Sequence, residues 1–353
     1  MSITSTKEIS NKKKWSHSLV WFRNDLRIID NPALFSACQR SDKVTAVFLI
    51  AEKQWREHDW SNRRIYLTLL ALRDLANSLA KLGIPLQIES INHFKKAPKA
   101  VEKIVQEKSI DAIYFNAEYA LDEKNRDSTI QEFCTNQEIH LNISHGSLII
   151  PPGTIRTKTR TPYKIFTPFK REWINTLVSF DRMPLGKPKA VTSHFKKNDD
   201  ENSQLLSQRL HKYKSKITKQ DLYFNENHGT EIFAQKQLRQ FIASKVNEYD
   251  DQRDVPSIDG TSSLSPALTV GLISPRSCLH AARAINEGHL ADYKKGVDTW
   301  INEIIWREFY CHLLADFPQI SLNKPLKPAT DYVPWRHNES EFTRCCEGKT
   351  GYP

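Results

Sequence analysis

Short apolar runs alternate with longer amphipathic stretches over the first 150 residues of the chain. Five of these runs are typical of strands, at residues 19–22, 44–51, 86–90, 112–116 and 140–143. Between the second and the third, isoleucine and leucine recur at helical spacing over residues 63–82, and Gly83-Ile84-Pro85 ends that helix. Strands that alternate with helices form a parallel sheet with right-handed crossovers. The pattern therefore predicts a five-stranded parallel α/β domain.

The pattern after residue 150 predicts an irregular segment followed by a helical one. Residues 151–229 are irregular, and within them residues 187–203 combine lysines, a proline and acidic side chains with little that could form a core. Helical periodicity returns over 233–246, Ser274-Pro275 places an N-cap residue before a proline, and 297–317 form a longer helix. We expect a flexible basic extension over 1–17, the α/β domain over 18–150, a linker over 151–229 and an all-α domain over 230–353.

Composition adds a modest indication of a nucleic-acid partner. Lysine and arginine number 51 against 41 aspartates and glutamates, a formal net charge of +10. Such an excess favours nucleic-acid binding, because neutralised phosphates release their counterions. No apolar run approaches the roughly 20 residues that span a bilayer, and the six cysteines show no C-x-x-C spacing. We expect a soluble, monomeric, cytoplasmic protein with reduced thiols, no bound metal and no membrane contact.

The turn after the first predicted strand lacks the fingerprint of a dinucleotide site. It reads Arg23-Asn24-Asp25-Leu26-Arg27, with no G-x-G-x-x-G. A conventional Rossmann dinucleotide site is therefore not expected in the α/β domain. Such a sheet still offers a crevice at the carboxyl ends of its strands.

Two stretches carry polar groups with both an ordinary and a functional explanation. Hydroxyls and backbone N–H groups follow Gly260, as in an anion-binding nest, although a helix cap is the commoner case. On the helix over 297–317, Trp300, Glu303 and Arg307 share one face. A surface pair between Glu303 and Arg307 is the commoner explanation, and a helix that bounds a polar cavity is the alternative.

Four stretches resemble the photolyase/cryptochrome family, and the pattern is closest to bacterial class I photolyases that repair cyclobutane pyrimidine dimers. They are LVWFRNDLR at 19–27 with the following Asp-Asn, YKIFTPF at 163–169, the sequence around GTSSLS at 260–265, and WINEIIWREFY at 300–310. Each stretch alone is only suggestive. Their order and spacing together are highly specific, and the resemblance covers residues 19–353.

The resemblance implies a flavoprotein that binds FAD and DNA containing pyrimidine dimers. The residues implied to hold FAD are Tyr249, Thr261, Ser262, Ser263, Leu264, Ser265, Trp300, Glu303 and Arg307. Those implied to contact DNA are Arg253, Glu303, Trp306, Arg307 and Tyr310. Ser263 stands where close relatives often have arginine, so one phosphate contact is expected to be weaker here.

The implied activity is that of a deoxyribodipyrimidine photo-lyase, a carbon–carbon lyase. Photoexcited reduced FAD donates an electron to the dimer, whose cyclobutane ring splits before the electron returns, so no general base is needed. Glu303 is expected to hydrogen-bond a pyrimidine of the dimer, and Trp306 to stack on the extruded bases. A dimer is poorly stacked in the duplex, so its extrusion costs less than that of normal bases. Trp335 matches the outermost tryptophan of the family's electron relay.

The resemblance also implies an antenna chromophore, and here its identity stays open. His58, Asp122 and Glu123 align with positions that hold 5,10-methenyltetrahydrofolate in folate-type relatives. Asp122 replaces the usual asparagine, and Ser321 and Leu322 replace a Cys-Lys pair. Two of the five contacts are thus kept. A surface histidine beside two tryptophans is the ordinary explanation of His58.

The sequence ends with GKTGYP at 348–353, which resembles the beginning of the family's most recognisable motif. The implied fold is a five-stranded parallel α/β antenna domain followed by an incomplete all-α FAD-binding domain. Apolar faces of the helical domain are then expected to lack neighbours, and activity of the isolated chain is in question. Two alternatives remain: a cryptochrome-type blue-light photoreceptor, and a non-catalytic remnant of a photolyase. The pair Glu303 and Trp306 favours repair over light sensing.

Overall fold

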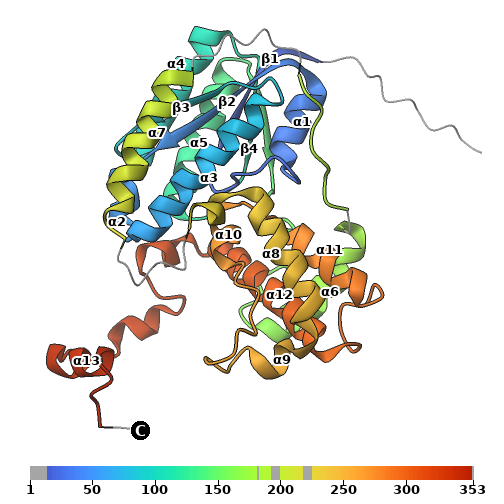
Figure 1. The fold of residues 1–353 in the computed structure, drawn as a ribbon, viewed down its shortest axis with the longest axis vertical. Coiled ribbons are helices and arrows are strands. Elements are labelled where there is room, and N and C mark those ends of the chain that lie inside the picture. Colours follow the sequence, from blue (N-terminus) through green and yellow to red (C-terminus); the bar gives the residue numbers. More distant parts are fainter. Residues whose placement is uncertain (1–13, 181–182, 192–198, 218–224, 352–353) are drawn as a thin grey trace, which may run out of the picture.

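The computed structural model describes residues 14–180, 183–191, 199–217 and 225–351 (Figure 1). An α/β layer lies above a group of helices in the view of Figure 1, and the C-terminal segment departs from both at the lower left. The predicted fold class, a parallel sheet followed by a helical region, is confirmed.

A five-stranded parallel sheet has the strand order β3-β2-β1-β4-β5. Val20 of β1 lies opposite Ala46 of β2 and Tyr114 of β4. The chain moves from β1 to one side and later returns to the other, so a topological switch point lies between β1 and β4. The strands are β1 Trp15–Phe22, β2 Ser41–Ile50, β3 Leu86–Ser90, β4 Ala112–Asn116 and β5 His140–Ser144.

Alternate residues of the central strands bury opposite faces of the sheet, as the period of two requires. Val20 and Phe22 face a core shared with α1 (Pro32–Arg40) and α3 (Asn62–Ala80). Leu19 and Trp21 face a second core shared with α4 (Ala97–Lys108) and α5 (Leu121–Asn136). Two short helices follow the carboxyl ends of strands: α2 (Glu52–Glu57) comes after β2, and the 3₁₀ helix η1 (Phe94–Lys96) comes after β3.

The expected basic extension over 1–17 is partly wrong. Residues 1–13 lie outside the described residues, but β1 already begins at Trp15, which pairs with Ser41 of β2. The Trp15 indole stacks on His140 with 4.8 Å between ring centroids, and His17 bonds to Thr45 at 2.9 Å. These side chains lengthen the strand beyond its apolar run, because they find partners on other strands of the sheet, β5 and β2.

The expected irregular linker over 151–229 is also wrong in part, because it contains two long helices. Helix α6 (Phe166–Phe180) buries Phe169, Trp173 and Leu177. Helix α7 (Asp199–Lys214) buries Leu206, Leu210 and Tyr213 and, in Figure 1, runs beside α3. Helix α7 carries only a narrow apolar stripe among charged residues, which concealed it, whereas α6 has an apolar face within a segment whose overall pattern is irregular. The domain boundaries themselves stay predictions.

The helices expected over 233–246, from Ser274-Pro275 and over 297–317 are confirmed as α8 Glu231–Ser244, α11 Pro275–Ile285 and α12 Lys295–Asp316. The structure adds two short helices, α9 Tyr249–Gln252 and α10 Ser265–Val270, and the 3₁₀ turns η3 Glu226–Gly229 and η4 Val246–Glu248. Thr230 caps α8, and Ser274 caps α11 by accepting a hydrogen bond from the N–H of Ser277 at 3.0 Å. Ser274-Pro275 therefore starts a helix as predicted.

Two buried carboxylates fasten the helical region to loops of the α/β region. Glu231 of α8 accepts hydrogen bonds from the backbone N–H groups of residues 28 and 29 at 3.0 and 2.9 Å. Glu308 of α12 accepts them from residues 149 and 150 at 2.9 and 3.1 Å. Burial raises the pKa of both carboxyl groups. The two regions are thus joined through specific polar contacts and not only by apolar packing.

Beyond its first turn, the C-terminal segment makes little contact with the body. It begins with η5 Pro318–Leu322, which contacts α5 and α12, and continues with η6 Pro328–Tyr332 and α13 Glu339–Cys346. Every described residue from Lys327 onward is exposed, including the ring of Phe342. An eight-residue helix without tertiary packing is marginal in water. Among the described residues, no helix is both long and apolar enough to cross a bilayer.

Candidate functional site

Helix α12 carries the largest group of predicted site residues, and its two faces differ as expected. Ile301, Ile305 and Phe309 are buried in the main core, together with His312. Glu303, Trp306 and Arg307 are only partly buried, and Tyr310 is 61% exposed. The apolar face therefore fixes the helix to the body, and the aromatic and charged face is left accessible.

An ion pair joins Glu303 to α9. Nη1 of Arg253, directly after α9, donates a hydrogen bond to Oε1 of Glu303. Tyr249, at the start of α9, is buried, and burial followed by the nearby Glu303 carboxylate raises the pKa of its phenol. Phe241 of α8 lies between Tyr249 and Trp300, with ring centroids 5.7 and 4.9 Å away. The structure thus brings five residues to one place, of which only Phe241 was not predicted as a site residue.

The hydroxyl-rich turn lies against the same short helix. A Cβ at Gly260 would come within 2.5 Å of the Cβ of Gln252, so only glycine lets the turn approach α9 this closely. Thr261, Ser263 and Ser265 are exposed, and Ser263 adopts a positive φ of 51°. Leu264 is buried beneath them. Exposed hydroxyls on an anchored turn are a donor set that fits a phosphate group.

Trp306 lies beside this group and not inside it. Its indole stacks on Phe166, with ring centroids 3.6 Å apart and planes 7° apart. Tyr310 lies 5.5 Å away at 23°. Within the described chain, no hydrogen bond or ring contact joins Trp306 to residues 261–265. The aromatic wall of Trp306 and Tyr310 is therefore linked to the phosphate-type turn only indirectly, through α12 and α9, within the described chain.

Two further predicted residues lie elsewhere. Arg307 points toward the α/β region, where its guanidinium donates to the carbonyl oxygen of Ser147 at 2.6 Å. The Glu303–Arg307 surface pair is thus not formed, because each side chain has a different partner. Trp335 is 69% exposed in the C-terminal segment, and its place in an electron relay stays a prediction.

The residues predicted to hold a folate do come together. Nε2 of His58 lies 3.1 Å from a carboxylate oxygen of Asp122, and the Gln54 amide bridges both at 2.9 and 3.2 Å. The Oγ of Ser321, another aligned position, accepts a hydrogen bond from the N–H of Leu121 at 3.2 Å. Burial, followed by the charge of Glu118, raises the pKa of Glu123, whose Oε2 has no hydrogen-bond partner within the described chain. An open cleft of about 400 Å³ runs past Gln54 and Asp122.

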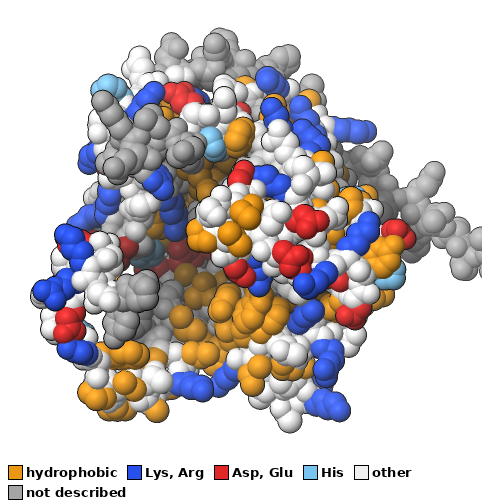
Figure 2. Space-filling model, turned by 60° about the horizontal axis from the view of Figure 1, so that its bottom comes forward, with side chains coloured by type: hydrophobic (Ala, Val, Ile, Leu, Met, Phe, Trp, Pro, Cys, Tyr) orange, Lys and Arg blue, Asp and Glu red, His pale blue; other side chains and the backbone are white. Residues whose placement is uncertain are grey.

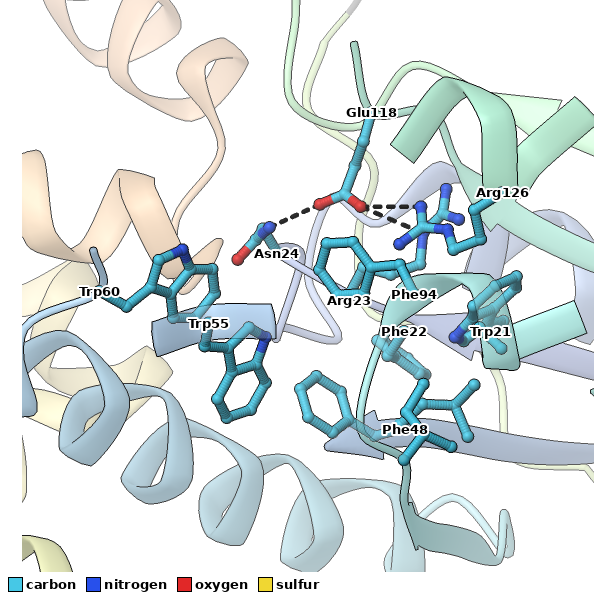
Figure 3. Close-up of a pocket in the computed structure, with 13 residues that line it drawn as sticks. Trp21, Phe22, Arg23, Asn24, Phe48, Trp55, Trp60, Phe94, Glu118 and Arg126 are labelled. Carbon is cyan, nitrogen blue, oxygen red and sulfur yellow. Dashed lines mark hydrogen bonds and ion pairs between the residues drawn. The ribbon is translucent and has the colours of Figure 1, made fainter. Parts of the chain in front are cut away.

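A second aromatic cluster was not predicted as a site. It stands at the carboxyl ends of β1 and β2, where Trp55 and Trp60 stack with planes 2° apart (Figure 3). One edge is polar, since Glu118 accepts hydrogen bonds from Asn24 and Arg126 (Figure 3). The cavity volume is about 30 Å³, which is room for about one water molecule. Side chains therefore largely fill this part of the crevice expected at the carboxyl ends of the strands, a packing that composition alone could not indicate.

The face of the molecule that contains the helical region is hollowed. Figure 2 shows hydrophobic side chains gathered around this hollow, with lysines and arginines on the surface around it. Exposed large apolar side chains of the helical and C-terminal regions include Ile165, Tyr310, Tyr332 and Trp335. Apolar side chains gathered around a hollow are typical of a binding face.

Comparisons with known proteins agree with this architecture. Residues 18–189 match the family model described as DNA photolyase, and residues 300–353 match the FAD binding domain of DNA photolyase. The deoxyribodipyrimidine photo-lyase of Escherichia coli is 34% identical over 347 residues, which are 95% of this chain and 68% of the relative.

Solved structures show the same fold. A bacterial class III photolyase from Agrobacterium tumefaciens has a TM-score of 0.77 at 27% identity, covering 98% of this chain and 68% of that one. A cryptochrome from Synechocystis has a TM-score of 0.74 at 20% identity, covering 97% and 70%. The similarity to the cryptochrome shows the fold alone, whereas the sequence identity to the photo-lyases shows the family. The chain belongs to the DNA photolyase family.

Proposed function

We propose that this chain binds FAD and repairs cyclobutane pyrimidine dimers in DNA by light-driven electron transfer, as a deoxyribodipyrimidine photo-lyase. The observation that supports this best is the arrangement on α12: an accessible Trp306 and Tyr310 beside the Arg253–Glu303 pair. Two relatives that carry this activity by name are 34% and 33% identical to the chain over 347 and 341 aligned residues.

The residues of α12 provide what an extruded lesion needs. The indole of Trp306 and the phenol ring of Tyr310 offer stacking surface that offsets the stacking lost in the duplex. The Glu303 carboxylate is an acceptor for the N–H groups of a pyrimidine, and the Arg253 guanidinium holds it in one orientation. Arg253 also adds positive charge near a polyanionic partner. Together they would select a poorly stacked pyrimidine dimer over the normal bases of DNA.

The residues around α9 fit the cofactor. Thr261, Ser262, Ser263 and Ser265 would hold its phosphates, with Tyr249 and Trp300 walling the site. When bound in its reduced form, FAD supplies the electron that opens the cyclobutane ring under light. The chain's own contribution is to bind, orient and exclude water around the lesion.

We further propose that the cluster of His58, Asp122 and Glu123 holds a folate antenna. The supporting observations are the shared hydrogen bonds of His58 and Asp122, the unpartnered Glu123 oxygen, and the adjoining cleft. A cleft of about 400 Å³ is within the usual range of small-molecule sites. Cytoplasmic location and a monomeric state remain predictions.

A repair assay tests the main proposal. The full 353-residue chain is loaded with FAD, reduced, and mixed with ultraviolet-irradiated oligothymidine in light and in darkness. Recovery of the thymine absorption band only in light is the expected result. A chain that shows flavin absorption but no repair would instead be a photoreceptor. A chain with no flavin absorption after FAD is added would be a non-catalytic remnant.

A further inference from the structure

The Trp306 indole does not stand alone on α12, because Phe166 lies flat against one of its faces. The two ring centroids are 3.6 Å apart, and the planes are nearly parallel at 7°. Phe309 meets both rings edge-on, at 5.9 Å from Phe166 and 5.7 Å from Trp306. Phe166 is the first residue of α6, in a part of the chain far from α12 in sequence.

The position of Phe166 is fixed from behind. One turn further along α6, Phe169 is buried against Phe309, with 5.1 Å between centroids. Trp173 is fully buried, and its indole N–H donates to the Glu308 carboxylate at 3.4 Å. Helix α6 therefore docks on α12 through a core that includes a directional polar contact. A phenyl ring at the end of such a docked helix is a fixed platform and not a mobile cover.

We propose that Phe166 is a positioning residue for lesion recognition, which holds the Trp306 indole so that its remaining surface is presented to an extruded pyrimidine dimer. This inference rests on the proposed function and adds a residue to it. A stacked partner removes alternative rotamers of the indole before the lesion arrives, so less freedom is lost on binding. Phe166 acts through Trp306 and does not touch the reacting atoms.

The effect is expected in affinity and not in chemistry. Replacing Phe166 by alanine removes the stacked partner, and an aromatic pair of this kind corresponds to a roughly 2- to 12-fold change in a binding constant. Affinity for an oligothymidine that contains one thymine dimer should fall by that factor relative to undamaged oligothymidine. The yield of repair per bound dimer should stay unchanged. Phe166→Tyr, which keeps the ring, should restore the affinity.

A double-mutant cycle on the full chain tests the inference. Discrimination between dimer-containing and undamaged oligothymidine is measured by equilibrium binding for wild type, Phe166→Ala, Trp306→Ala and the double variant. We expect the two losses to be non-additive, with Phe166→Ala having no further effect once Trp306 is absent. Additive losses, unchanged discrimination in Phe166→Ala, or tighter dimer binding in that variant would each overturn the inference.

Matched controls separate this role from general stability. Val178→Ala alters an 83% exposed position of the same helix and leaves both the Phe166–Trp306 stack and the packing of Phe169, so discrimination should be unchanged. Phe166→Leu keeps most of the side-chain volume and should still lose discrimination, even if Phe166→Ala folds poorly. A different result would contradict the proposed function itself: Trp306→Ala would distinguish dimer-containing from undamaged oligothymidine as well as wild type does. If Trp306→Ala loses discrimination and the Phe166 variants do not, only the present inference fails.

Discussion

This chain has two aromatic clusters of similar residues that differ in exposure. The closed cluster, Trp55 and Trp60, is buried, and the open cluster, Trp306 and Tyr310, is partly accessible. Trp55 and Trp60 stack at the carboxyl ends of the strands and are buried around a cavity of about 30 Å³. Trp306 and Tyr310 stand on α12 with surface left open, and Tyr310 is 61% exposed. The first pair is covered by Phe48 and by the Arg64 guanidinium, 3.6 Å from the Trp60 ring.

The comparison shows that the exposure of an aromatic pair, and not its residue types, decides whether the pair stabilises the core or can contact a ligand. In the closed cluster both tryptophans are buried, so their rings contribute to the stability of the α/β region. In the open cluster the Trp306 indole stacks on Phe166 and is only partly buried, and Tyr310 beside it is mostly exposed. Four predictions test this contrast, from the largest expected effect to the smallest.

Trp55→Ala should have the largest effect, and the effect should be on stability. Removing a buried tryptophan from a packed core costs about 3–5 kcal/mol of unfolding free energy. Urea denaturation followed by circular dichroism measures the loss. Discrimination of dimer-containing oligothymidine by the folded fraction should be unchanged. A loss well below this range would mean that the closed cluster is not part of the core.

Trp306→Ala should show the reverse pattern. Stacking of a base on an aromatic side chain contributes about 1–3 kcal/mol, so discrimination of the dimer should fall roughly 5- to 150-fold. The unfolding free energy should fall less than in Trp55→Ala, because the Trp306 ring is only partly buried. Equal stability losses in the two variants would erase the distinction between the clusters.

The stability contributed by Glu308, which joins α12 to Trp173 of α6 behind the open cluster, should depend on pH. Burial raises the folded-state pKa of Glu308, so the stability that this carboxyl contributes is present below its unfolded pKa of about 4.3 and is lost as pH rises through its folded pKa. A rise of one unit in a folded-state pKa corresponds to about 1.4 kcal/mol of unfolding free energy. Glu308→Gln should remove this part of the pH dependence in urea titrations between acidic and neutral pH.

Glu231→Gln is the matched control for that titration. Glu231 is buried, binds two consecutive backbone N–H groups and has a raised pKa, but it lies on α8. Both variants should flatten the pH profile, and only Glu308→Gln should also weaken dimer discrimination, because Glu308 contacts Trp173 of α6. A constant offset at all pH values would contradict the assignment of the titration to these groups.

Arg73→Ala should have the smallest effect. Its guanidinium donates to Glu226 at 2.8 Å across the surface next to α3, with both side chains about half exposed. Exposed ion pairs of this kind contribute about 0–1 kcal/mol, and salt screens them. Neither dimer discrimination nor the integrity of the closed cluster should change. A larger loss would indicate that this surface is more tightly packed than its exposure suggests.

The sheet and the main helices could be predicted because their signals are local. Period-two burial in β1 and the helical repeat of α3 are properties of neighbouring residues, and Ser274-Pro275 marks a helix start by its own chemistry. Helices α6 and α7 escaped prediction because their stripes of three apolar residues become meaningful only when α12 and α3 cover them.

The candidate site likewise has parts that could be predicted from the sequence and parts that could not. The motifs identified Glu303, Trp306 and the turn over 261–265, since a family resemblance rests on residue types and spacing. They did not indicate that Glu303 pairs with Arg253, that Arg307 turns to Ser147, or that Phe166 covers Trp306. Each of these contacts joins residues at least 50 positions apart.

The sequence by itself determined the fold class and the family, and it supplied the candidate site residues. Only the tertiary structure decided which aromatic faces are closed and which are open, and which charge meets which partner. The physical reason is that periodicity and motifs report on the backbone and on single residues. Burial and pairing depend on segments that are distant in the chain and meet only when the chain is folded.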